Sequence, residues 1–280
     1  MEKSKNKVVN AITVILLTML SISFLYPIYI VLINSFKGKL YISSDPFSLP
    51  IGETFVGIEN YVFGFTKSKF HMAFLYSLFI TVGSVILIVL FMSMTAWYIT
   101  RVKTKATAIM YYLFVFSMIV PFQMVMFPMV KIADMLSLDN PVGILFLYMG
   151  FGAGLTVFMI SGFVKSIPLE IEEAATIDGC SPLQLFFRIV FPILKPTAIT
   201  VAILNAMWVW NDYLLPALVI GNDYKTIPVA VQGVLMGSYG DKNMGALMAM
   251  LVLAIIPIIV FYLSCQKYII KGVIAGAVKG

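Results

Sequence analysis

The chain has 280 residues, of which 61% are hydrophobic and only 11% are charged. A soluble domain carries about 25% charged residues. A mean hydropathy of +0.99 over the whole length leaves too few charges to cover a water-facing surface, which excludes a soluble enzyme, a disordered chain and a coiled coil and indicates a polytopic membrane protein. The net charge of +6 comes from short basic clusters between apolar runs, which is typical of membrane topology rather than of nucleic-acid binding.

Apolar runs long enough to cross a bilayer recur along the chain. The first follows Lys3, Lys5 and Lys7 and is too long for the core of a secretory signal, so we expect it to be kept as a spanning helix. Six spans are predicted, approximately at residues 8–36, 70–100, 106–130, 141–164, 196–221 and 244–266. The predicted fold class is an all-α integral membrane protein in which residues 1–280 form a single transmembrane domain.

The distribution of basic residues predicts the orientation of these spans. With six spans both termini lie on the same side, and that side holds twelve of the 19 Lys and Arg residues. Because positive charges are enriched in cytoplasmic loops, we expect both termini in the cytoplasm. The largest inner loop is then residues 165–195.

This inner loop has the sequence pattern of two short helices. Pro168 suits a first helical turn, and the acidic residues after it favour the amino end of a helix. Gly179 is a typical carboxyl-terminal stop. Ser181 and Gln184 are spaced for a capping box that starts the second helix.

Two prolines, Pro192 and Pro196, are expected to separate this second helix from the fifth span. A short, mostly apolar helix pair at the membrane surface must bury one face. The pattern alone leaves two alternatives: the pair packs only under its own bundle, or it binds a partner.

The spacing within this loop resembles the signature of binding-protein-dependent ABC importer permeases. The chain carries Glu-Ala-Ala, then Gly after three residues, Ile after a further nine, and Phe-Pro after one more, where that family has Leu-Pro. The residues that carry the resemblance are Glu173, Ala174, Ala175, Asp178, Gly179, Ile189, Phe191 and Pro192.

Further segments are similar to the maltose-type carbohydrate branch of that family. They are residues 34–37, 59–61, 210–212 and the tail 276–280. Over its full length the chain resembles the second, six-span membrane subunit of a sugar importer. The resemblance implies a type I ABC importer permease fold, in a multi-pass protein of the bacterial cytoplasmic membrane that imports a carbohydrate, in particular an oligosaccharide.

The resemblance also implies that this chain is not itself an enzyme. Because the sequence has no GxxxxGK[ST] phosphate-binding loop, ATP and Mg would be used by two copies of a separate cytoplasmic ATPase, and no cofactor or metal is expected here. The other implied partners are a second permease subunit, an extracellular solute-binding protein, the carbohydrate and the lipid bilayer. No nucleic-acid partner is expected. The inner loop would be a coupling loop seated in the ATPase, through Glu173, Ala174, Ala175, Asp178, Gly179, Ile189 and Pro192.

Polar residues inside a membrane are costly and often functional. In the fifth span, Asn205, Trp208 and Asp212 share a helical face, and Asn211 lies beside them. Since sugars bind to aromatic faces and polar side chains, these residues and Gln123 of the third span are candidates for a substrate pathway. The alternative is that Asp212 lies in the hydrated outer interface and that the tryptophan is an interfacial anchor.

Two other functions are compatible with parts of the sequence. The coupling loop alone would also fit an ABC permease for a non-sugar solute, although the fifth span and the tail favour a sugar. A secondary sugar transporter would show inverted repeats and buried ionisable relays, for which only Asp212 is a candidate. His71 is the single histidine, and Cys180 and Cys265 have no metal or disulfide spacing.

Overall fold

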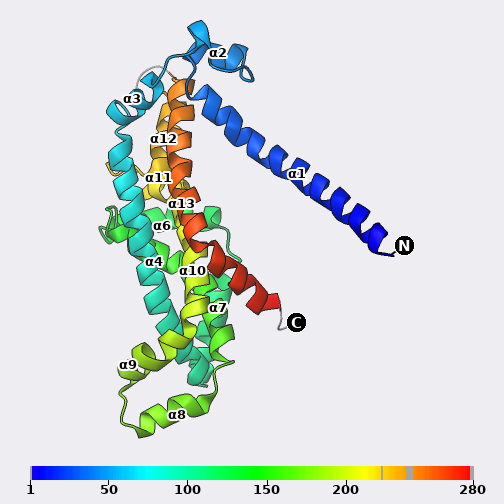
Figure 1. The fold of residues 1–280 in the computed structure, drawn as a ribbon. Coiled ribbons are helices and arrows are strands. Elements are labelled where there is room, and N and C mark those ends of the chain that lie inside the picture. Colours follow the sequence, from blue (N-terminus) through cyan, green and yellow to red (C-terminus); the bar gives the residue numbers. More distant parts are fainter. Residues whose placement is uncertain (1, 222, 238–241, 278–280) are drawn as a thin grey trace. The chain divides into compact units, whose positions relative to one another are not determined.

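The computed structural model describes residues 2–221, 223–237 and 242–277, and these residues are mainly helical (Figure 1). They form two compact units: Met1–His71 with Ala230–Pro257, and Met72–Val229 with Ile258–Gly280. Residues 278–280 of the tail that resembles the permease family lie outside the described part.

The first unit combines the amino-terminal helix with a folded loop. Among the described residues, none buries the most apolar stretch of the span Val9–Asn34 in α1 (Glu2–Asn34). The loop contains α2 (Lys39–Ser44), the 3-10 turn η1 (Gly52–Thr54) and α3 (Glu59–Thr66), and the unit also includes parts of α12 (Ile227–Leu235) and α13 (Met244–Ala277). A helix that is apolar on all sides requires lipid or another protein around it.

Polar side chains fold the first loop, residues 35–69, by binding its main chain. The Asn60 amide donates to the carbonyls of Ser35 and Lys37, at 2.9 Å each. Lys37 is fully buried, and its Nζ donates to the carbonyl of Asp45 at 2.7 Å. Asn34 donates to a carbonyl twelve residues later in the chain. Two of the segments that resemble the permease family, 34–37 and 59–61, therefore hold this loop together.

The second unit is a bundle around α7 (Gly143–Val164), which packs against α5 (Lys105–Ser117) and α10 (Phe191–Asn211). Figure 1 shows α4 (Phe70–Arg101), α7 and α10 side by side. Small residues allow the close approach, since a Cβ on Gly152 would lie 2.7 Å from Asn205 Oδ1 and one on Gly154 would lie 2.6 Å from the Phe114 carbonyl oxygen.

Five helices in the described residues are long and apolar enough to cross a membrane. They are Val9–Asn34, Phe70–Arg101, Gly143–Val164, Pro182–Asn211 and Met244–Gln266. The sixth predicted span is present only if α5 and α6 (Phe122–Met135) are counted as one broken span.

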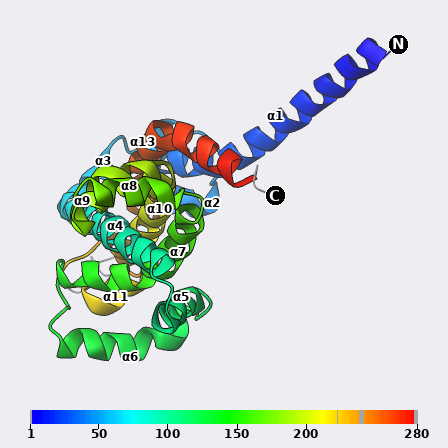
Figure 2. The same ribbon diagram turned by 90° about the horizontal axis from the view of Figure 1, so that it is seen from below.

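The third predicted span, 106–130, is therefore not one straight helix. Its two halves, α5 and α6, meet at 109°, and α6 lies against α11 (Leu214–Val219) (Figure 2). The break falls before Pro121, which has an extended ψ of 136°. Proline has no N–H for the helical ladder and disfavours a helical conformation at the residue before it, so the helix stops and restarts.

The start of the fifth span also differs from the prediction, because Pro192 and Pro196 do not separate two helices. The helix continues from α9 (Pro182–Leu185) through a π-helical turn, η2 (Phe186–Val190), into α10. In η2 the Phe191 N–H reaches the carbonyl of Phe186, five residues back. The extra residue in this turn accommodates the proline that follows it and that cannot donate a hydrogen bond.

The far end of this span is shorter than expected. The helix ends at Asn211 rather than near residue 221, because Asp212 has an extended ψ of 127°. One carboxylate oxygen of Asp212 accepts from the Leu214 N–H at 3.0 Å, where α11 begins. A side chain that binds the backbone two residues on favours a turn over a continued helix.

Candidate functional site

The coupling loop, residues 165–195, contains α8 (Leu169–Ile177), which ends in a tight left-handed turn. Gly179 has a φ of +85°. Its N–H donates to the carbonyl of Thr176, and the N–H of Cys180 donates to the carbonyl of Ala175, both at 3.0 Å. This pair of hydrogen bonds is a Schellman motif, which requires a left-handed residue and so explains the glycine. The predicted stop at Gly179 is confirmed.

The restart of the helix after this turn also follows the prediction. The Ser181 hydroxyl accepts from the Gln184 N–H, while the Gln184 side chain accepts from the Ser181 N–H at 3.0 Å. This capping box satisfies donors at the first turn of α9.

A carboxylate on α8 attaches the coupling loop to the bundle. Glu172 is only 5% exposed, and its Oε1 accepts from Arg101 Nη2 at 2.6 Å and from Arg101 Nε at 2.9 Å. Its Oε2 accepts from Trp97 Nε1 at 2.9 Å, and the guanidinium also donates to the carbonyl of Ile167 at 3.0 Å. We call Trp97, Arg101 and Glu172 the Glu172 anchor. Both carboxylate oxygens of Glu172 accept hydrogen bonds, as a buried charge requires.

The sequence predicts only a topogenic charge at Arg101 and an acid near a helix start at Glu172, and not this anchor. One feature of the sequence does favour burial of Glu172: it lies three residues before Ala175 and therefore on the same helix face as this small residue. Both are buried in the structure.

The opposite side of α8 is exposed. We call it the free face, and it consists of Glu170, Glu173, Ala174 and Ile177, all exposed and spaced as one helical stripe. Ile177 is 86% exposed. The free face therefore presents two carboxylates, those of Glu170 and Glu173, together with the small Ala174 and the apolar side chain of Ile177.

The predicted coupling residues divide between the free face and the bundle. Glu173, Ala174, Asp178, Gly179 and Pro192 are exposed. Ala175 is buried, and Ile189 is half-buried against the same core. Ala175 therefore allows α8 to approach its own bundle closely, and the sequence-based analysis did not include Glu170 and Ile177, which complete the exposed stripe.

The polar residues of the fifth span form a second candidate site, at the other end of α10. The hydroxyl of the buried Tyr148 donates to Asp212 Oδ2 at 3.0 Å. The Tyr148 ring also meets Trp208 edge-on, with ring centroids 5.4 Å apart. Trp208 remains 41% exposed. Tyr148 therefore contacts both the Asp212 carboxylate and the Trp208 ring.

The other predicted pathway residues lie apart from this group. Asn205 is buried and donates to the carbonyl of Val201 and to Thr156 Oγ1 on α7, so it joins two helices. Asn211 is exposed and donates to Met207 within its own helix. Gln123 is exposed in the first turn of α6. Within the described residues no cluster of three or more His, Cys, Asp or Glu could hold a metal.

Residues 93–275 match the family described as the binding-protein-dependent transport system inner membrane component. This match covers more than half of the chain, so the chain belongs to this family and is a multi-pass permease component of the cytoplasmic membrane, not a catalytic subunit. The predicted identification is thereby confirmed.

Two relatives with sugar-related names are similar to the chain over nearly its full length. The chain is 41% identical over 261 residues, 93% of each protein, to AmyC of Thermoanaerobacterium thermosulfurigenes, described as a "probable starch degradation products transport system permease protein". It is 36% identical, over 95% of each protein, to the multiple sugar-binding transport system permease protein MsmG of Streptococcus mutans.

A solved structure confirms the fold. It is that of a bacterial ABC transporter involved in the import of the acidic polysaccharide alginate. The TM-score is 0.77 with 22% sequence identity, and the match covers 94% of this chain and 97% of the other. The predicted type I importer permease fold is therefore correct.

Proposed function

We propose that this chain is the permease subunit of an ATP-driven importer that takes up a carbohydrate, specifically an oligosaccharide, delivered by an extracellular binding protein. The observation that carries the proposal is the nearly full-length similarity to AmyC and MsmG, whose names refer to starch degradation products and to multiple sugars. The coupling loop lies within the residues 93–275 that match the permease family.

In this function the coupling loop receives mechanical work from a separate ATPase, present in two copies, which binds ATP and Mg. The free face of α8 docks in a cleft of that ATPase, and the Glu172 anchor transmits the movement to α4. A short helix seated in a socket moves as a rigid body. Glu173 would pair with a donor in the socket, and Ile177 would fill an apolar part of it. This role places the coupling loop and both termini in the cytoplasm.

The second permease subunit would cover the apolar surface of α1. That span buries none of its most apolar stretch within its own chain. Lipid could cover such a surface as well. However, an importer needs a second bundle to enclose a pathway, and the exposed surface of α1 is available to contact that second bundle.

Transport by proteoliposomes tests the proposal. The chain, co-purified with its partners and binding protein, is expected to take up starch-derived or other short oligosaccharides only when ATP is present inside. Glu173→Lys and Gly179→Asp should insert in the membrane but hydrolyse ATP without uptake. Asp139→Lys, which makes the same charge change as Glu173→Lys at an exposed residue before α7, serves as the control and should transport normally.

Each alternative function gives a different result in this assay. Uptake without ATP would indicate a secondary transporter, and stimulation by amino acids but not sugars would indicate another ABC branch. Full transport by Glu173→Lys would remove that residue from the docking surface.

We further propose that Trp208 and Asn211 line the sugar pathway, with Tyr148 and Asp212 holding the Trp208 ring in place. An exposed aromatic face beside polar groups suits the apolar face and hydroxyls of a pyranose. Asn205 and Gln123 stay weaker candidates, because the first is buried between helices and the second lies on α6. Trp208→Ala should raise the KM for sugar several-fold while basal ATP hydrolysis is kept, whereas Phe158→Ala, at an exposed aromatic residue of α7, should leave KM unchanged. An unchanged KM in Trp208→Ala would contradict this role.

A further inference from the structure

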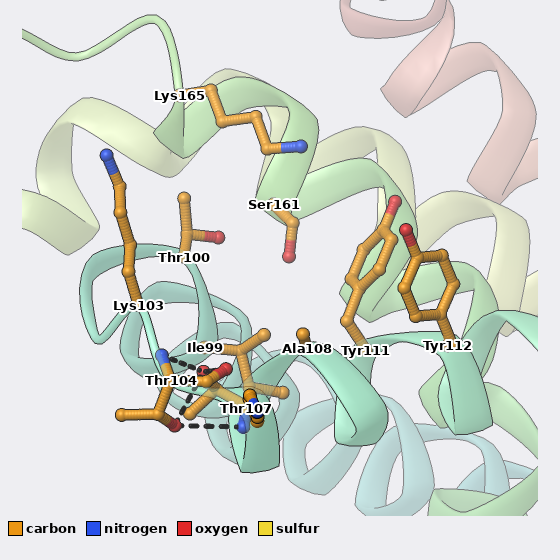
Figure 3. Close-up of a pocket in the computed structure, with 11 residues that line it drawn as sticks. Ile99, Thr100, Lys103, Thr104, Thr107, Ala108, Tyr111, Tyr112, Ser161 and Lys165 are labelled. Carbon is orange, nitrogen blue, oxygen red and sulfur yellow. Dashed lines mark hydrogen bonds between the residues drawn. The ribbon is translucent and has the colours of Figure 1, made fainter.

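A basic cavity lies at the base of the coupling loop, between the ends of α4, α5 and α7 (Figure 3). Its volume is about 550 Å³, and its eleven lining residues include Lys103, Lys105 and Lys165 but no acidic residue. Figure 3 shows Lys103 and Lys165 on either side of Thr100, with the Lys165 side chain extending over Ser161. The proposed function does not use this cavity.

Several features of the cavity favour a bound anion. The ion pair at this end of the bundle joins Arg101 to Glu172 and does not include the three lysines. Lys165 Nζ lies 5.6 Å from the centre of the Tyr111 ring, which orients its charge by a cation–π contact. Helix α5 begins at the cavity, with Thr104 as its amino-terminal cap. The positive end of the helix dipole therefore adds to the charge of the lysines.

An apolar stripe leads away from the cavity along α5. It consists of Ile109, Tyr112, Leu113 and Phe116, which are exposed and spaced as one helical face. Tyr112 belongs both to this stripe and to the wall of the cavity. A ligand with an anionic head and a hydrocarbon tail would match both surfaces at once, whereas a small soluble anion would use only the cavity.

We propose that this cavity binds the phosphate headgroup of an anionic phospholipid, with an acyl chain along the α5 stripe. Basic pockets between spanning helices at the cytoplasmic side are suited to such headgroups. Lys165 directly follows α7 at the start of the coupling loop, and Lys103 lies two residues after Arg101 of the Glu172 anchor. A bound phosphate would join these two segments and neutralise the repulsion between their lysines.

Native mass spectrometry of the full chain, purified in detergent and stripped of lipid, tests the assignment. The chain is titrated with dioleoyl phosphatidylglycerol, dioleoyl phosphatidylcholine and glycerol 3-phosphate. We expect phosphatidylglycerol to bind at least tenfold more tightly than phosphatidylcholine and to resist displacement by glycerol 3-phosphate. A lysine near a membrane surface contributes about a fivefold change in affinity for an anionic lipid, so Lys103→Gln with Lys165→Gln should weaken binding about 25-fold.

Two matched variants make the test specific. Arg188→Gln with Lys195→Gln removes the same charge outside the cavity and should change the affinity less than twofold, and Lys103→Arg with Lys165→Arg should keep the wild-type affinity. Equal losses in the Arg188 and Lys195 variant, or equal binding of phosphatidylcholine, would overturn the site. Displacement of the lipid by glycerol 3-phosphate at equal concentration would instead assign the cavity to a soluble phosphate ester. None of these results depends on sugar transport, so they test the cavity separately from the proposed function.

Discussion

Two connections in the described part of the chain, the first loop and the coupling loop, are held in different ways. In the first loop, Asn34, Lys37 and Asn60 each donate to main-chain carbonyls, so the polar contacts are spread over the connection. In the coupling loop, the polar side-chain contacts of α8 with the bundle converge on one carboxylate, Glu172, which is bound by Arg101 and Trp97, while Ala175 adds an apolar contact. The first arrangement holds the conformation of a whole loop, whereas the second attaches one helix to the bundle.

This difference matches what each connection has to do. A loop that binds its own main chain at several places resists local opening, because each broken contact leaves a hydrogen-bonding group unpaired. A helix held along one face keeps its orientation while its opposite face stays free to bind. The free face of α8 is such a surface, so a single polar anchor suits the proposed role of passing on a movement, and the distributed contacts suit a loop that keeps its shape.

The largest effect is expected from removing the Glu172 anchor. Glu172→Ala leaves the Arg101 guanidinium and the Trp97 N–H without their acceptor, and breaking a buried pair costs about 3 kcal/mol. We use a low value for a buried pair because the Arg101 side chain is still 18% exposed. We expect uptake in proteoliposomes to be lost and the segment 165–181 to become sensitive to limited proteolysis.

Glu170→Ala is the matched control, since this residue lies on the same helix, carries the same charge and is exposed. It should leave protease sensitivity unchanged. Arg101→Met combined with Glu172→Met should be less destabilising than the sum of the two single changes, because no unpaired charge is left. Strict additivity would show that the two side chains do not act as a pair.

The next effect concerns the first loop. Asn60→Ala removes the donor shared by the Ser35 and Lys37 carbonyls and should lower the free energy of unfolding by about 1–3 kcal/mol. Thermal unfolding in detergent measures it, with Val62→Ala on the exposed side of α3 as the control. Since the contacts of this loop are distributed, we expect a lower midpoint without local protease sensitivity. Selective cleavage of the loop would show that Asn60 is a single anchor, like Glu172.

The local chemistry of both connections could be predicted from the sequence better than their tertiary contacts. The stop at Gly179 and the capping box at Ser181 depend on residues within one or two turns, so their pattern is sufficient. The Glu172 anchor joins residues 71 positions apart in the chain, and no local pattern specifies that pairing. The same limit applies to Asn205, because its helical face does not indicate that it is buried and donates to Thr156 on α7.

Span boundaries failed where prolines were involved. Pro121 was expected inside a continuous span and breaks it, while Pro192 was expected to break a helix and is accommodated by η2. A proline removes one hydrogen bond in either case. Whether the chain bends or inserts a π-turn depends on how it packs, and in η2 both Phe186 and Val190 are buried in the core, with the Trp97 ring against Phe186.

The smallest effect is expected at Gly179, and it separates backbone strain from lost contacts. A Cβ at this position would meet nothing within 4 Å, whereas its φ is +85°. Gly179→Ala should therefore cost only the strain of a left-handed residue, about 1 kcal/mol. Gly162→Ala provides the reference, because that glycine also has open space but lies in the regular helix α7, where alanine is favoured.

The lower stability of Gly179→Ala should appear as faster amide hydrogen exchange in α8 and its turn, with no change in the first loop. Gly179→Asn should lose less stability than Gly179→Ala, since asparagine tolerates the left-handed region. If Gly179→Ala instead matched Glu172→Ala in protease sensitivity, the turn rather than the carboxylate would be holding α8 to the bundle.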